Sequence, residues 1–176
     1  MTHRQDSADA EIVPIDEHSK SLFERVADYL TADEWIFTTN EEQRYFSMTI
    51  KLRDASARII VDVVEDDGWA QALVYTLFSM YVPEHRRGAM CEAINRINFA
   101  LRFGNLEMDH EDGQVRVRTV AYGSQNLSEQ VFGGVLRSNI NTADRYQGAL
   151  LAVAFGNAQP ETVRDMATRA EESTLQ

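Results

Sequence analysis

The chain is poor in the residues that would indicate export, a membrane span or a multi-cysteine site. It has one cysteine, Cys91, among 176 residues. A single thiol excludes an intramolecular disulfide and every metal site that needs several cysteines, and Cys91 is predicted to be a small buried side chain within a helix. No apolar run approaches the roughly 20 residues of a transmembrane helix, and the polar, acidic N-terminus lacks the apolar stretch of a secretory signal. We therefore predict a cytoplasmic protein with no membrane partner.

Basic residues are also scarce. The sequence has 17 lysines and arginines against 28 acidic residues, which gives a formal net charge of -11. A surface with this charge repels a phosphate backbone, so nucleic acid is excluded as a partner. The pairs Arg86/Arg87 and Arg116/Arg118 are too small to form the basic stripe that a nucleic-acid-binding protein needs, and solvated surface charge explains them better.

What the chain does have is enough length and apolar content for one domain. A chain of 176 residues with 44% hydrophobic residues can bury a core without disulfides or metals. We predict a disordered acidic tail at residues 1–16 and a single domain at residues 17–158. A short helix opened by Pro160 and a frayed end then occupy residues 159–176.

Apolar periodicity predicts the secondary structure. Residues 46–52 alternate between apolar and polar side chains, which is typical of a strand with one buried and one wet face. Residues 59–63 continue the pattern after a turn, and residues 106–119 form a second hairpin around an Asp-Gly turn. Residues 69–81 are apolar on both alternating positions. This strand is therefore either covered on both faces, or its second face is an interaction surface.

Three longer segments have helical periodicity. They begin before Leu22, at Pro83 and after Ser128, and the last is weakened by Gly133 and Gly134, so it could bend or break. Together the elements predict an α+β fold: an antiparallel sheet of five or six strands with helices mainly on one face, in the order α-β-β-β-β-α-β-β-α, with a short final helix. The side chains predicted to form the core are Leu22, Val26, Met48, Ile50, Val61, Leu106, Val117 and Leu136.

Several local phrases resemble the bacterial YbjN family over residues 19–155. They are Val82-Pro83-Glu84 at a strand end, Ile94-Asn95-Arg96-Ile97-Asn98, the turn Glu111-Asp112-Gly113, Leu127-Ser128, and Ala143-Asp144-Arg145-Tyr146. The resemblance implies a fold like that of type III secretion chaperones, which are often dimeric, and a role as a sensory-transduction regulator. It brings no catalytic residue, substrate or cofactor.

No pattern of catalytic residues stands out, and we predict no cofactor and no metal. His110 lies among acidic residues, but a solvated turn explains it better than a metal site, because neighbouring strand residues point to opposite faces. Ser124 lacks the second glycine and the strand-to-helix context of a nucleophile elbow.

Two classes of function therefore stay open. We favour a non-enzymatic protein-interaction or chaperone-like module, a regulator in bacterial signalling with an unidentified protein partner. The alternative is a small-molecule-binding domain or an enzyme that uses scattered polar residues such as Asn95, Asn98 and Tyr146. We also predict a homodimer, because Met90, Ile94 and Ile97 form an apolar helix stripe that could meet a symmetry mate. The residues predicted for this interface are Met90, Ile94, Ile97, Phe78 and Met80.

Overall fold

The computed structural model describes residues 20–66, 69–123 and 127–174, so the tail predicted at residues 1–16 lies outside the described residues. The elements are, in chain order, α1 (Leu22–Ala32), β1 (Thr38–Asn40), β2 (Tyr45–Lys51), β3 (Ser56–Asp66), β4 (Trp69–Tyr81), the 3-10 turn η1 (Glu84–Arg86), α2 (Arg87–Asn98), β5 (Asn105–Met108), β6 (Gln114–Gly123), α3 (Glu129–Phe155), the 3-10 turn η2 (Pro160–Thr162) and α4 (Val163–Thr174).

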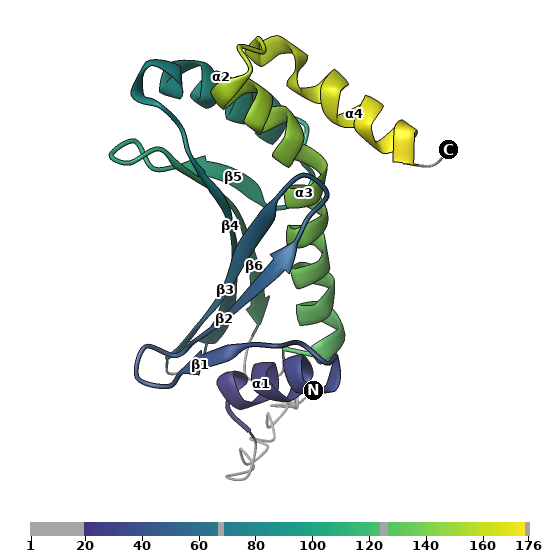
Figure 1. Cartoon of the computed structure of the whole chain (residues 1–176). Coiled ribbons are helices and arrows are strands. Elements are labelled where there is room, and N and C mark those ends of the chain that lie inside the picture. Colours follow the sequence, from purple (N-terminus) through teal and green to yellow (C-terminus); the bar gives the residue numbers. More distant parts are fainter. Residues whose placement is uncertain (1–19, 67–68, 124–126, 175–176) are drawn as a thin grey trace, which may run out of the picture.

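The six strands form one antiparallel sheet in the order β1-β2-β3-β4-β6-β5. The sheet is curved, and the helices lie along its convex side, with α3 running the length of the sheet (Figure 1). The predicted α+β class and the order of elements are therefore confirmed. The likeness to type III secretion chaperones stays a prediction.

A capping box formed by Ser21 and Glu24 marks the start of helix α1. The Ser21 hydroxyl accepts a hydrogen bond from the Glu24 backbone N–H, and the Glu24 carboxylate accepts one from the Ser21 backbone N–H. This reciprocal pair satisfies two donors that a helix N-terminus leaves free. The buried face of α1 is formed by Leu22, Val26 and Leu30, at steps of four residues, and it packs against β3, β4 and α3.

Helix α3 is continuous over its 27 residues, so the predicted weakening at Gly133 and Gly134 does not interrupt it. Gly133 is required by packing, because a Cβ atom there would overlap the ring of Tyr29 from α1. Ser128 is the N-cap of the helix, as predicted, and its hydroxyl accepts a hydrogen bond from the Val131 backbone N–H.

A buried polar cluster fixes α3 over the sheet. Asn139, which is fully buried in α3, accepts a hydrogen bond from the Thr76 hydroxyl of β4 at 2.5 Å. Its side-chain amide donates to the Val74 carbonyl oxygen of β4 at 2.9 Å and to the Thr119 hydroxyl of β6 at 3.0 Å. Because an unpaired buried amide is costly, this cluster allows one position of α3 along the sheet and disfavours others.

The core lies between the sheet and the helices in two clusters, one under α1 and the first half of α3, and one among α2, the second half of α3 and α4. Of the side chains predicted to form the core, all but Ile50 are buried. Ile50 is only half-buried. The final helix α4 joins the core through Val163 and Ala167, which are almost completely buried.

Candidate interaction surface

The central strand β4 has two apolar faces, and the structure places them on opposite sides of the sheet. One set of side chains lies under the helices and is buried: Ala70, Ala72, Val74, Thr76 and Phe78. The other set lies on the side that no helix of the described residues covers: Trp69, Gln71, Tyr75 and Leu77, which are partly exposed, and Leu73, which is 7% exposed. We call this side of the sheet the open face. No helix of the described residues covers this second face of residues 69–81, and its role as an interaction surface stays a prediction.

Neighbouring strands extend the open face in both directions. The strand register places Ile60 of β3 and Arg118 of β6 on either side of Tyr75. In the same way Asp62 and Val120 flank Leu73. The outer part of the face includes Tyr122, whose side chain is 70% exposed and stacks on Trp69 with ring centroids 6.4 Å apart. The face is thus a mixture of aliphatic, aromatic and charged side chains on a rigid sheet.

The charged residues at the β5–β6 end of the open face form a network. Arg116 donates hydrogen bonds to the Glu107 carboxylate at 2.7–2.8 Å, and its guanidinium lies 4.5 Å from the centre of the Tyr75 ring. Arg118 lies 3.7 Å from the same carboxylate. Burial raises the pKa of Glu107, but the amide of Asn105 and the two guanidinium groups outweigh this effect, so the net pKa lies below its usual value. Glu107 is therefore held in its charged form.

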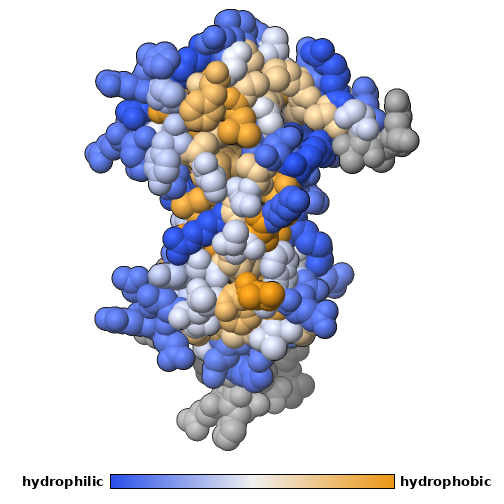
Figure 2. Space-filling view, in the orientation of Figure 1, coloured by the Kyte–Doolittle hydropathy of each residue, from blue (hydrophilic) through white to orange (hydrophobic). Residues whose placement is uncertain are grey.

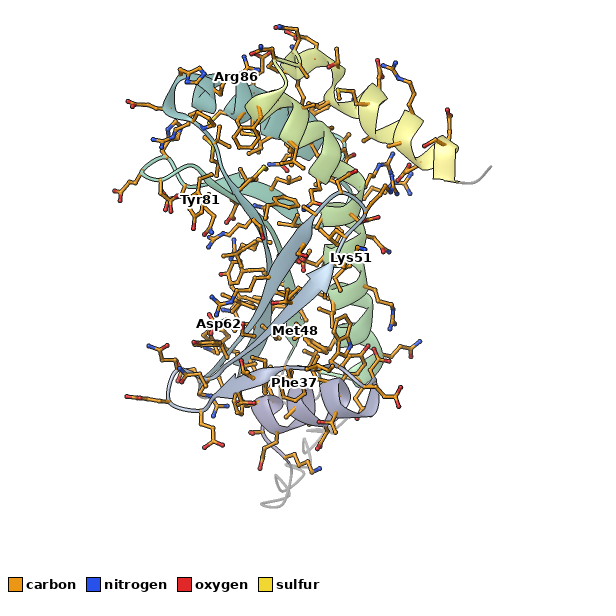
Figure 3. The ribbon with its side chains drawn as sticks, viewed as in Figure 1. Phe37, Met48, Lys51, Asp62, Tyr81 and Arg86 are labelled. Atoms are coloured by element: carbon orange, nitrogen blue, oxygen red, sulfur yellow. The ribbon has the colours of Figure 1, made fainter. Side chains whose placement is uncertain are left out.

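Asp62 is the opposite case on the same face. It lies on β3 on the side away from the helices (Figure 3) and is half-buried between Tyr45 and Leu73, its cross-strand neighbours. Burial raises the pKa of this carboxyl, and among the described residues it has no ion-pair partner. A partly desolvated carboxylate without a cation costs free energy that a positively charged partner would recover.

The five side chains predicted for a dimer interface lie in the core of this same chain. None of Met90, Ile94, Ile97, Phe78 and Met80 is more than 7% exposed. They pack against α3, α4 and the sheet as one cluster, so they cannot contact another molecule unless the core opens. Periodicity identified Met90, Ile94 and Ile97 as one apolar helix stripe but could not tell which surface covers it.

Of the three polar residues considered for a small-molecule site, Asn98 has a structural role, and Asn95 and Tyr146 lie in a groove. Asn98 is structural, because its side chain both donates to the Leu106 carbonyl oxygen at 3.0 Å and accepts from the Leu106 N–H at 2.8 Å. Asn95 and Tyr146 line a groove between α2, α3 and α4 with a volume of about 760 Å³. Two arginines of this groove are already paired: Arg96 with Glu92 and Glu161, and Arg145 with Glu171.

The structure also brings together two residues that the sequence keeps apart. Cys91 Sγ on α2 lies 3.2 Å from Nε2 of His110 in the β5–β6 turn. Arg87 holds this turn by donating to the carbonyl oxygen of His110 at 2.8 Å. The residues are 19 positions apart with no motif between them, so only the fold could reveal the contact. Within the described parts of the chain, no group of three or more His, Cys, Asp or Glu side chains could hold a metal ion.

These features describe an α+β protein with one open sheet face and a groove among α2, α3 and α4. Comparison with family models matches residues 22–152 to the YbjN family, described as "putative bacterial sensory transduction regulator". The chain belongs to the YbjN family. A search of curated proteins finds no match. Among the described residues no helix is long and apolar enough to cross a bilayer.

Proposed function

We propose that the chain is a non-enzymatic protein-interaction module in bacterial signalling and that its partner docks on the open face of the sheet. The observation that carries the proposal is the second apolar side of β4, which is central in the sheet but has no helix over it in the part of the chain that the structure describes. The family's description as a regulator of sensory transduction supports a role in which binding transmits a signal.

The first partner that we propose is a second copy of the chain, and its interface is the open face. Asp62 lacks a cation, and Arg58 on the same face makes no ion pair among the described residues. A twofold axis along β4 would bring the β3 side of one copy opposite the β6 side of the other, where arginines could approach Asp62. Sheets that pack face to face in this way bury their facing side chains in a layer about 10 Å thick.

A photo-crosslinking experiment in the native bacterial cell tests this proposal. A photoreactive phenylalanine analogue replaces Tyr122 on the open face, and the matched control replaces Val131, which is 50% exposed on α3. We expect a discrete protein adduct from position 122 and none from position 131. An adduct with the mass of two chains supports the homodimer, and a heavier or lighter adduct identifies another partner.

No adduct from position 122, or equal adducts from both positions, would refute docking on the open face. The oligomeric state is measured separately by light scattering at about 50 µM, where a homodimer has twice the 20.0 kDa mass of one chain. Changing Tyr122 to lysine should shift that mass toward a monomer, and changing Val131 to lysine should not.

The groove among α2, α3 and α4 supports a second candidate, small-molecule binding. Its volume of about 760 Å³ lies in the range of ligand sites, and it is lined by both signs of charge around Tyr146. A zwitterionic ligand would suit this lining. NMR shifts of the Asn95 side chain on titration with free amino acids would support the candidate, and their absence at about 10 mM would count against it.

A further inference from the structure

The two edges of the sheet differ in how their outward-facing backbone groups are hydrogen-bonded. At one edge, the outward N–H and C=O groups of Leu106 in β5 are both bound by the Asn98 side chain. At the other edge, β1 pairs with β2 over only three residues, from Tyr45 to Ser47. Beyond Ser47, β2 keeps β3 on its inner side but has no strand on its outer side among the described residues, so its final residues lie at the edge of the sheet (Figures 1 and 3).

The hydrogen-bond pattern shows which backbone groups are free at this edge. The Leu52 N–H donates to the Ala55 carbonyl oxygen, and the Val63 N–H donates to the Arg44 carbonyl oxygen. In an antiparallel ladder these two bonds mean that even-numbered residues of β2 bond to β3 and odd-numbered residues point away from it. Tyr45 and Ser47 meet β1, as their register shows.

Thr49 and Lys51 are therefore left with their N–H and C=O groups directed outward. Neither residue has a backbone partner on that side among the described residues. Two consecutive outward-facing residues present four groups at the spacing of a strand, which only another extended backbone can match. A strand that adds to an exposed edge gains its affinity from such main-chain bonds, and its side chains decide specificity.

The side chains around the free edge define what such a strand would carry. On the open face, Lys51 is exposed and makes no ion pair among the described residues, and the Arg58 Nε donates to the Ser47 hydroxyl at 2.9 Å, so its guanidinium lies over β2. On the helix side, Ile50 is only half-buried. Ile36, two residues before β1, is 92% exposed. Figure 2 shows a small apolar patch over β1 and β2 with hydrophilic residues around it.

We propose that the free end of β2 binds an extended segment of a partner protein in which acidic and aliphatic residues alternate. The residues opposite Thr49 and Lys51 point to the open face, where acidic side chains meet Lys51 and Arg58. The residue opposite Ile50 points to the helix side, where an aliphatic side chain covers Ile50. Arg58 borders both surfaces, but the free backbone groups of Thr49 and Lys51 lie at the edge and not in the centre of the open face, so the proposal does not depend on the function proposed above.

A synthetic peptide tests the proposal directly. The probe is a fluorescent pentapeptide, Glu-Val-Glu-Val-Glu with blocked ends, titrated with the full chain and followed by anisotropy. Thr49→Pro removes one outward N–H but no bond to β3, and proline is tolerated at such an edge position. The matched control, Thr49→Val, keeps the N–H. We expect saturable binding by the natural chain and by Thr49→Val, and a loss of at least about tenfold in Thr49→Pro.

Two further measurements test the proposal even if Thr49→Pro fails to fold. With the natural chain, a probe with N-methylated backbone amides should lose binding to a similar extent, because it cannot complete the ladder. Lys51→Glu should weaken binding by about two- to fivefold, as expected for exposed charges. Tyr122→Lys should leave peptide binding unchanged, which separates this site from the open-face dimer.

The proposal is overturned if the acidic probe shows no binding at about 1 mM. It is also overturned if the N-methylated probe binds as well as the unmodified one, or if Lys-Val-Lys-Val-Lys binds as well as the acidic probe. Conversion of a dimer to a monomer by Thr49→Pro would show that a second copy occupies this edge, and it would likewise overturn the assignment to a partner segment.

Discussion

Replacing Asn139 with alanine should remove the cluster that holds α3 on the sheet. The Thr76 and Thr119 side chains are at most 2% exposed, and both hydroxyls bond to the Asn139 side chain at 2.5–3.0 Å. Each would lose a buried partner, at a cost of about 1–3 kcal/mol. We therefore expect the free energy of unfolding to fall by about 2–5 kcal/mol, measured by urea titration with circular dichroism.

A triple variant tests whether unsatisfied polar groups are the cause. Combining Asn139→Leu with Thr76→Val and Thr119→Val replaces the three polar side chains of the cluster by apolar side chains of similar shape. Such a replacement can be nearly neutral, so the triple variant should recover most of the lost stability. A loss below about 0.5 kcal/mol for Asn139→Ala, or a triple variant less stable than the single one, would refute this explanation.

Four further substitutions test the sheet edge, the packing of α3 and the charge network of the open face. Asn98→Ala should lower stability by about 1–2 kcal/mol and speed amide hydrogen exchange at Leu106, since both outward groups of that residue lose their partner. Gly133→Ala should destabilise by about 1–3 kcal/mol through overlap with the first helix, and Gly134→Ala, which has open space around it, should stabilise by about 0.5–1 kcal/mol. Thermal melts that ranked the two glycine variants in the other order would contradict the packing described for α3. Glu107→Gln should lower the melting temperature at pH 7, because the pKa of this carboxyl is depressed in the fold. Its contribution is present above the usual carboxyl pKa of 4.5 and is lost as the pH falls through the lower folded value, so the two melting curves should converge in acid.

The sequence by itself determined the class of fold, because periodicity is a local property. Residues 46–52 alternate with period two and form most of β2, and the stripe at Leu22, Val26 and Leu30 repeats every four residues and forms the buried face of α1. Capping is equally local, so Ser128 could be identified as the start of α3 from its own side chain. The family phrases lie in the same stretches, and the match over residues 22–152 agrees with them.

What covers an apolar stripe is decided only by the tertiary structure. Met90, Ile94 and Ile97 have the same pattern whether they face their own sheet or another molecule, and the fold buries them internally. Asn139 appears in the sequence as an ordinary polar residue of a helix, yet it is fully buried because strands far along the chain supply its partners.

The surfaces that carry the proposals also depend on long-range geometry. Periodicity predicted helices mainly on one face of the sheet, but which side chains of β4 lie on the face without helices follows from the strand register and the packing of the described helices. The free groups at Thr49 and Lys51 depend on where β1 ends beside β2, and the closed edge at Leu106 depends on Asn98, eight residues away. Local residues determine which elements form, and the packing of distant elements determines which of their faces and edges are left exposed.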